Sequence, residues 1–184
     1  MRILGIDPGL RLTGYGVIDA TGPLRPKLID GGVIRLREKQ PIATRLVELE
    51  RDLEAIFVEH KPDVCGVETL YAHYNHPRTA ILMGHARGVI LLVAARHGAR
   101  IEQFTANRIK QSVTGYGHAS KEQMQRAIQS VFALKEPPDP PDVADALAVA
   151  ICCGLDLHTR GATFRSGVDA GPAVVEEVEV GEDE

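Results

Sequence analysis

The sequence predicts an α/β domain in which helices cover a mixed β-sheet. Three observations favour this class: three strand-like runs with short connections, then alternating helical and strand-like segments, then two or three further helices. The chain of 184 residues, 44% of them apolar, suits one domain with a full core. We expect the domain to span residues 1–157 and an acidic, disordered tail to occupy residues 158–184.

The first segment is the one that we expect the remaining chain to surround. Residues 2–6 are typical of a buried strand, which runs directly into the turn signal Asp7-Pro8-Gly9. A return strand follows at 13–19, where the glycines on both sides of Tyr15 let something bulky or charged approach the backbone. A third strand at 27–36 completes an antiparallel meander.

Helical and strand-like segments alternate after the meander. Pro41 opens a helix with one apolar face, which ends before Pro62. A strand at 64–67 delivers Glu68, and a loop at 71–78 precedes a long helix at 79–96. The remaining elements are a strand at 100–104, a short helix at 106–113, a helix from Lys121 to about Leu134 with Ser120 as its N-cap, and a helix at 142–156 after several prolines.

Composition limits the class of protein further. No apolar run of membrane-spanning length and no signal-peptide pattern are found, which predicts a cytoplasmic protein with no membrane association. The three cysteines lack zinc-site spacing and are expected to be buried. The net charge is −4, but residues 169–184 hold seven acidic residues and no basic ones. Removing these seven charges leaves +3 for residues 1–168, a balance that suits a polyanionic partner.

Four acidic residues stand out by position. Asp7 and Glu68 each end an apolar strand, and Asp142 and Asp145 share one face of an apolar helix. A buried carboxylate needs a compensating cation, and Mg²⁺ or Mn²⁺ prefers oxygen ligands. Two such ions can activate a water and stabilise the leaving oxygen of a phosphodiester. The pattern therefore predicts a two-ion phosphodiesterase site in which Asp7 bridges the ions.

Simpler interpretations of the same residues remain open. Asp7 could only cap its turn, Asp142 could only complement a helix dipole, and Glu68 could be a solvated strand end. Metal-free glycoside hydrolysis is less apt because the chain has no Trp to build a sugar-stacking cleft. His73 and His76 lack further ligands at zinc spacing.

Several segments together resemble the RuvC family, the bacterial Holliday-junction resolvases. The resemblance is carried by residues 1–9, 68–71, 108–121 and 142–147, and it covers about residues 1–157 in order. It implies an RNase H-like fold and a homodimer that nicks two opposed strands of a four-way DNA junction. Mg²⁺ or Mn²⁺, two ions per site, would be the cofactor. Cutting would leave 5′-phosphate and 3′-hydroxyl ends, in recombination and repair, alongside the branch-migration motor proteins of the same pathway.

The resemblance also implies roles for single residues. The catalytic and metal-binding acids would be Asp7, Glu68, Asp142 and Asp145, although some relatives have His at the position of Asp142. Lys110 and Lys121 would lie near the scissile phosphate. Tyr71 would stack on an exposed junction base, where relatives have Phe. The loop positions of Arg11 and Arg78 suit contacts with DNA phosphates.

Three other functions compete with junction cutting. A related RNase H-like nuclease that acts on RNA or on an unbranched substrate would use the same acids. An actin-like ATPase or sugar kinase also opens with a strand and an acidic turn, but it needs two lobes, for which 184 residues are too few. A non-catalytic junction-binding protein would not need four acids. Two symmetric cuts favour a two-fold dimer, and the apolar helix at 81–95 could belong to its interface or to the core.

Overall fold

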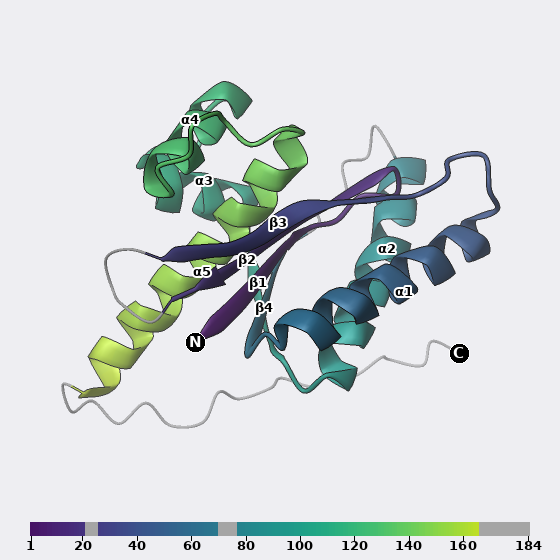
Figure 1. Cartoon of the computed structure of the whole chain (residues 1–184), viewed down its shortest axis with the longest axis horizontal. Coiled ribbons are helices and arrows are strands. Elements are labelled where there is room, and N and C mark those ends of the chain that lie inside the picture. Colours follow the sequence, from purple (N-terminus) through teal and green to yellow (C-terminus); the bar gives the residue numbers. More distant parts are fainter. Residues whose placement is uncertain (21–25, 70–76, 166–184) are drawn as a thin grey trace, which may run out of the picture.

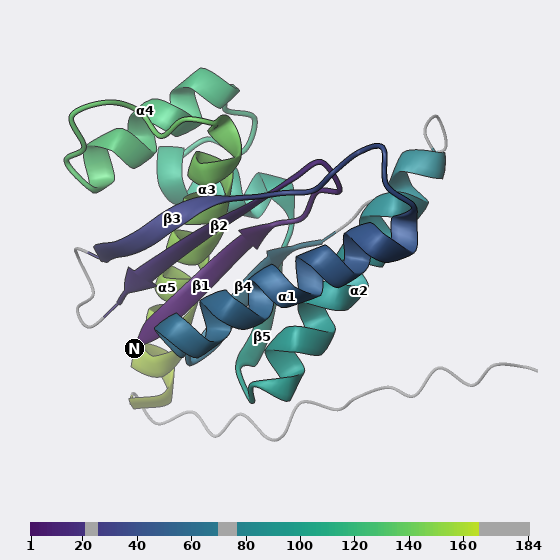
Figure 2. The same cartoon turned by 45° about the vertical axis from the view of Figure 1, so that its right-hand side comes forward.

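The described part of the chain forms one mixed five-stranded sheet (Figures 1 and 2). The computed structural model describes residues 1–20, 26–69 and 77–165. The strands lie in the order β3-β2-β1-β4-β5, so the first strand is central, as predicted. The β1–β2 and β2–β3 pairs are antiparallel, and the β1–β4 and β4–β5 pairs are parallel. The strand bounds are β1 (Arg2–Asp7), β2 (Leu12–Asp19), β3 (Lys27–Arg35), β4 (Val64–Glu68) and β5 (Arg100–Phe104).

Helices cover both faces of this sheet (Figures 1 and 2). On one face, α1 (Ile42–His60) and α2 (Pro77–Arg96) pack against each other and bury one apolar cluster. On the other face, α5 packs on β1 and β2, and α3 and α4 pack on α5. These three helices are α3 (Ala106–Thr114), α4 (Lys121–Val131) and α5 (Pro141–Arg165). The predicted mixed α/β class is confirmed.

Helix boundaries differ from the predicted ones by a few residues. The helix α2 begins at Pro77, two residues early. The helix α4 ends at Val131 rather than near Leu134, because Ala133 adopts a left-handed φ of 51° that a right-handed helix cannot continue through. Its start is as predicted: Ser120 and Gln123 form a complete capping box, so Gln serves where Glu is commoner.

The last helix is longer than predicted. It continues to Arg165, beyond the expected helix end at 156 and the expected domain boundary at 157. Ion pairs of Arg160 stabilise the additional turns of α5: the guanidinium lies 2.8 Å from the Asp156 carboxylate and 3.5 Å from that of Glu102 on β5. The division into a domain and a tail stays a prediction, and residues 166–184 lie outside the described residues.

Close contact between α5 and the sheet depends on glycine. A Cβ atom added to Gly5 of β1 would lie 2.2 Å from the Ala146 carbonyl oxygen and 2.5 Å from the Ala150 nitrogen. The helix backbone therefore rests directly on the backbone of the central strand, with small alanines facing it. The cysteines, Cys65, Cys152 and Cys153, are free and buried, as predicted.

Candidate active site

Strand alternation turns the carboxylates of Asp7 and Glu68 toward the helix α5. Gly5 and Gly66 both face α5, and residues two apart along a strand share a face. The parallel β1–β4 register pairs Gly5 with Gly66 and Ile6 with Val67. Continuing this register by one residue places Asp7 beside Glu68. Asp7 and Glu68 are therefore neighbours at the carboxyl ends of adjacent strands, on the α5 side of the sheet.

The start of α5 lies on the backbone beside Asp7. Gly14 is the β2 partner of Asp7, and a Cβ atom added to Gly14 would lie 2.1 Å from the Asp142 carbonyl oxygen. Asp142 and Asp145, three residues apart, share a face of the first helical turns. Because Gly14 has no side chain, the start of α5, which carries Asp142 and Asp145, can pack directly against β2 beside Asp7.

Mutual electrostatics join the four acids into one cluster. The pKa of Asp7 is raised from 3.8 to about 8, first by burial and then by the negative charges of Asp145, Glu68 and Asp142, in that order. Burial also raises the pKa of Glu68, and the charge of Asp145 raises it further. Burial likewise raises the pKa of Asp145, to which the charge of Asp142 adds. The structure thus brings the sequence-predicted acids into one electrostatic environment.

Two lysines oppose this negative charge. Lys121, the first residue of α4, lowers the pKa of Asp7 and of Asp145, whereas Lys110 on α3 lowers that of Glu68 and of Asp145. Each lysine belongs to a different helix of the layer above α5, so both reach the same cluster from one side. The predicted role of both lysines beside the scissile phosphate stays a prediction.

The donor chemistry of the cluster fits a hard divalent cation. Within the described residues, the side chains of Asp7, Glu68 and Asp145 form no hydrogen bond or ion pair. In the described part of the chain, no group of three or more Asp, Glu, His or Cys side chains lies close enough together to hold a metal ion as the side chains stand. The four carboxylates offer only oxygen donors, a set that favours Mg²⁺ or Mn²⁺. Asp7, Glu68, Asp142 and Asp145 are the residues able to hold such ions.

The ends of β1 and β4 are held by residues that sequence reasoning missed. Thr13, fully buried, donates from Oγ1 to the Gly9 carbonyl (2.5 Å) and accepts from the Gly9 N–H (3.3 Å), which closes the turn after Asp7. The Arg87 side chain of α2 donates to the Glu68 carbonyl (3.4 Å). Arg87 is distant from Glu68 in the sequence, and Thr13 lies inside an apolar strand, so no local sequence pattern points to either residue.

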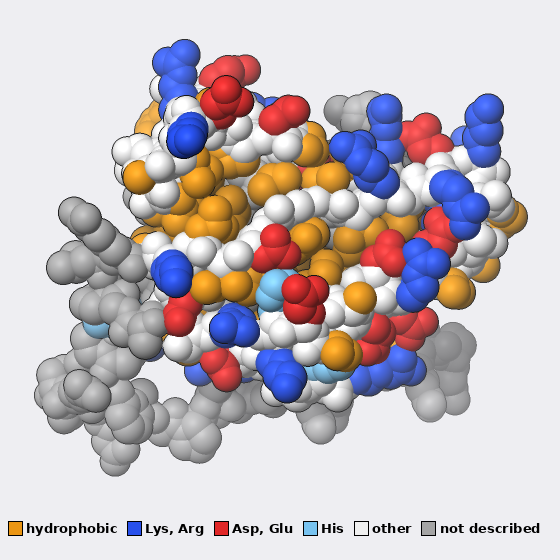
Figure 3. Space-filling view, in the orientation of Figure 1, with side chains coloured by type: hydrophobic (Ala, Val, Ile, Leu, Met, Phe, Trp, Pro, Cys, Tyr) orange, Lys and Arg blue, Asp and Glu red, His pale blue; other side chains and the backbone are white. Residues whose placement is uncertain are grey.

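The predicted phosphate contacts lie near one end of the sheet. Arg11 is exposed and pairs with Glu38 (2.8 Å), and it lines a basic hollow with Arg35, Arg37 and Lys39. In Figure 3, basic side chains gather where β3 leads into α1. Arg78 is exposed in the first turn of α2, next to Thr79, which lines a hollow together with Arg11 and Asp142. Tyr71, His73 and His76 lie outside the described residues.

The metal-free protein is expected to lose stability as pH rises from about 4 to about 8. The folded protein keeps a proton on Asp7 up to about pH 8, whereas the unfolded chain releases it near 3.8. An ion at 100 times its dissociation constant adds about 2.7 kcal/mol to the free energy of unfolding. For this chain length we expect Tm to rise by about 5–10 °C with Mn²⁺ at pH 8 and less at pH 6. Calorimetry of the wild type and of Asp7→Asn checks this, and an equal Mn²⁺ shift in the variant would contradict it.

Comparison with known proteins gives a single answer. The family described as "Crossover junction endodeoxyribonuclease RuvC" matches residues 3–153. A protein of that name from Rhodopirellula baltica is 47% identical over 150 residues, which cover 82% of this chain and 84% of the relative. Another from Caldicellulosiruptor saccharolyticus is 45% identical over 152 residues, covering 83% of this chain and 91% of the relative.

Solved structures agree with the sequence matches. The Thermus thermophilus RuvC structure superposes with a TM-score of 0.78 at 28% identity, covering 87% of this chain and 97% of that one. The same Thermus protein in complex with Holliday junction substrate gives a TM-score of 0.80 at 28% identity, with 87% and 96% covered. The RNase H-like fold implied by the resemblance is thereby confirmed.

Proposed function

This chain belongs to the RuvC family of crossover junction endodeoxyribonucleases, and from that premise we propose that it resolves four-way DNA junctions by two symmetric nicks. Cleavage in this family depends on metal ions. The observation that carries the proposal is the convergence of two strand ends and one helix start, each bearing carboxylates, with two lysines above them. An RNase H-like nuclease for RNA or unbranched DNA is the alternative.

The residues of the cluster have distinct parts in the proposed reaction. Asp7, Glu68, Asp142 and Asp145 would hold two Mg²⁺ or Mn²⁺ ions, which when bound supply water activation and stabilisation of the leaving 3′-oxygen. Attack of water on phosphorus, with loss of the 3′-oxygen, leaves 5′-phosphate and 3′-hydroxyl ends. Asp7, at the end of the central strand and within the electrostatic reach of the other three acids, would be the ligand shared by the ions.

Basic residues position the DNA strand in this proposal. Lys110 and Lys121 bring positive charge to the carboxylate cluster, where a phosphate would otherwise be repelled. Arg11 lines one hollow together with Asp142, and Arg78 is exposed next to Thr79, which lines the same hollow. We assign both arginines to the backbone phosphates of the same strand. Tyr71 is assigned by resemblance to stack on an exposed junction base.

Cleavage of three substrates tests the proposed function. A four-way junction, a linear duplex of the same sequence and an RNA/DNA hybrid are incubated with Mg²⁺, with Mn²⁺ and with chelator. We expect paired nicks in the junction only, and only with metal. Preferential cutting of the duplex or the hybrid would support the alternative nuclease, and phosphate release from ATP without DNA would support the kinase-like class.

The surface of α2 supports the proposed homodimer. Residues 78–96 form a helix long and apolar enough to cross a membrane by length and composition, which corrects the expectation that no run is long enough. One side of α2 packs into the core through Ala86 and Ile90, while Ile81 and Leu92 stay 60% and 47% exposed. Exposed apolar side chains on one side of a helix are typical of a surface that contacts another protein.

Glycines on the same exposed side would let two copies of α2 approach closely. A Cβ atom added to Gly84 or Gly88 meets nothing within 4 Å, so both glycines face open space. Across a two-fold axis, the exposed side of α2 would contact the same side of a second copy. We assign the dimer interface to this surface.

Gly88→Glu is expected to convert the dimer into a monomer. A carboxylate at the centre of an apolar interface would lose its hydration without gaining a partner. Sedimentation at micromolar concentration should show the monomer mass, and junction cutting should shift from paired to single nicks. Val131→Glu is the control, because Val131 is 40% exposed on α4, over the opposite face of the sheet. A Gly88→Glu variant that stays dimeric would place the interface elsewhere.

The remaining assignments complete the proposal. A DNA-cutting enzyme of this family would act in the cytoplasm, beside the branch-migration motor proteins of the pathway. Residues 1–157 would be the nuclease domain and 158–184 the acidic segment, with the qualification that α5 itself runs to Arg165.

A further inference from the structure

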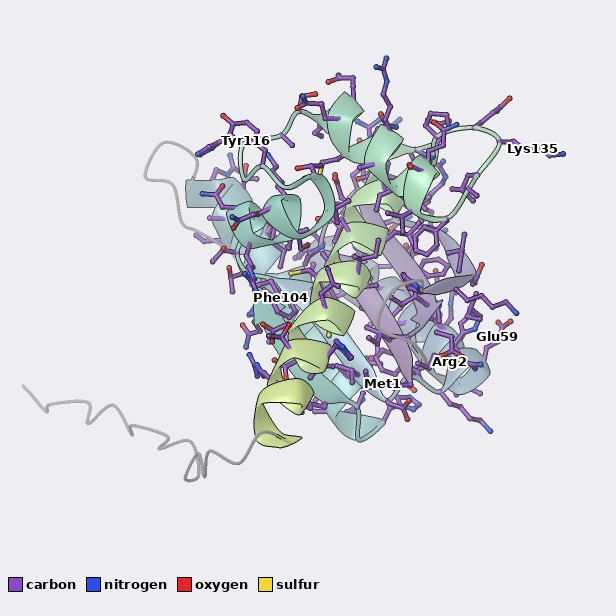
Figure 4. The ribbon with its side chains drawn as sticks, turned by 90° about the vertical axis from the view of Figure 1, so that its left-hand side faces the viewer. Met1, Arg2, Glu59, Phe104, Tyr116 and Lys135 are labelled. Atoms are coloured by element: carbon purple, nitrogen blue, oxygen red, sulfur yellow. The ribbon has the colours of Figure 1, made fainter. Side chains whose placement is uncertain are left out.

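An exposed aromatic pair lies on the connection between α3 and α4. Tyr116 is 59% exposed, one of the most exposed large apolar side chains among the described residues. Its ring meets that of His118 edge to face, with 5.6 Å between the ring centroids and 68° between the planes. In Figure 4, Tyr116 lies at the margin of the molecule, toward the end opposite Met1. No core contact explains an aromatic side chain left in water to this extent.

The backbone of Tyr116 is fixed from both sides. The Thr114 hydroxyl lies 2.9 Å from both the Lys110 and the Tyr116 carbonyl oxygens and accepts from the Tyr116 N–H at 3.1 Å. The Ala119 N–H donates to the Tyr116 carbonyl (3.3 Å), and Gly115, at a φ of 75°, ends α3 in the left-handed conformation. Because the backbone is held, the ring is presented in water without the entropy cost of ordering a loose loop.

This turn is bracketed by the two lysines of the active site. Lys110 precedes Tyr116 by six residues on α3, and Lys121 follows it by five as the first residue of α4. Helices α3 and α4 pack against each other and on α5, so the turn that joins them lies in the helix layer that carries both lysines. Cations beside an exposed aromatic face are the combination that binds single-stranded or unstacked nucleic acid.

We propose that Tyr116, with His118 at its edge, is a second base-stacking contact on the junction, beside the scissile phosphate. This inference rests on the proposed function and adds a specificity-determining residue to it. Tyr116 would receive an unpaired or distorted base of the strand that Lys110 and Lys121 hold by its phosphates. A continuous duplex keeps its bases stacked, so this contact favours branched over linear DNA.

Junction binding without cutting isolates the contact. In the Asp7→Asn background, Tyr116→Ala should weaken binding of a four-way junction by about 5- to 150-fold, the range of one lost base stack. Tyr116→Phe should bind like the parent and Tyr116→Leu like Tyr116→Ala, since stacking needs an aromatic face. Junctions with 2-aminopurine next to the cut site should lose the fluorescence change on binding in Tyr116→Ala and Tyr116→Leu and keep it in Tyr116→Phe. Val58→Ala, at a site 62% exposed on α1, is the matched control.

Three results would overturn the inference. Tyr116→Ala could bind the junction as tightly as the parent, Tyr116→Leu could restore full affinity, or binding could fall with 2-aminopurine unchanged at every position next to the cut. The last two results would assign Tyr116 a packing role instead. Failure of the wild type to cut junctions at all would refute the proposed function, and the assay separates that outcome from these.

Discussion

Asp7→Asn is expected to lower the rate of junction cleavage by at least about 1,000-fold while junction binding in chelator stays equal to or tighter than that of the wild type. Asparagine keeps the shape of the side chain but removes the charge that would hold and bridge the ions. Metal ions contribute several kcal/mol to transition-state stabilisation, and each 1.36 kcal/mol is a factor of ten in rate. Binding is spared because removing a negative charge lowers repulsion of the phosphates.

Single-turnover cleavage and equilibrium binding on the same junction measure the two effects separately. Asp52→Asn makes the same chemical change on α1, where Asp52 pairs with the exposed Arg51, and it should leave both quantities unchanged. Loss of binding together with cleavage in Asp7→Asn would mean that Asp7 is structural. Equal cleavage by variant and wild type would remove Asp7 from the site.

The sequence predicted the acids better than it predicted what brings them together. Asp7 and Glu68 were recognisable because each follows a short apolar strand, and the helix spacing of Asp142 and Asp145 put those two on one face. Their convergence depends on sheet order and on the approach of α5, which are tertiary properties. The glycines beside Tyr15 indicated a close approach, but the approaching element could not be read from them.

Other features depend on partners that are distant in the sequence. Arg87 reaches the Glu68 carbonyl from α2, and nothing local in an apolar helix marks it as a support of the site. The length of α5 was underestimated because its last turns are polar; ion pairs of Arg160 with Asp156 and Glu102 hold them. Apolar periodicity detects helices by their buried face, so a partly exposed helical end goes undetected.

Gly14→Ala is expected to damage cleavage through geometry alone, without altering any charged group. The added Cβ atom would lie 2.1 Å from the carbonyl oxygen of Asp142 and 2.7 Å from its carbonyl carbon. Both are backbone atoms, so no side chain can rotate away, and either β2 or the first turn of α5 has to move by about 1 Å. A displacement of that size between catalytic groups costs about 100-fold in rate.

The nearby Gly31→Ala separates this effect from a general intolerance of alanine in the sheet. Its Cβ atom would lie 3.3 Å from Cγ1 of Val143, a side-chain atom that can give way, so Tm and cleavage should change little. Gly14→Ala should instead lower the free energy of unfolding by about 1–3 kcal/mol, as overpacking does, and should lose cleavage with it. Asp7→Asn, by contrast, removes cleavage without overpacking the core. A Gly14→Ala protein with wild-type Tm and cleavage rate would show that α5 does not rest on β2 beside Asp7, and the carboxylate cluster would then lack the support described here.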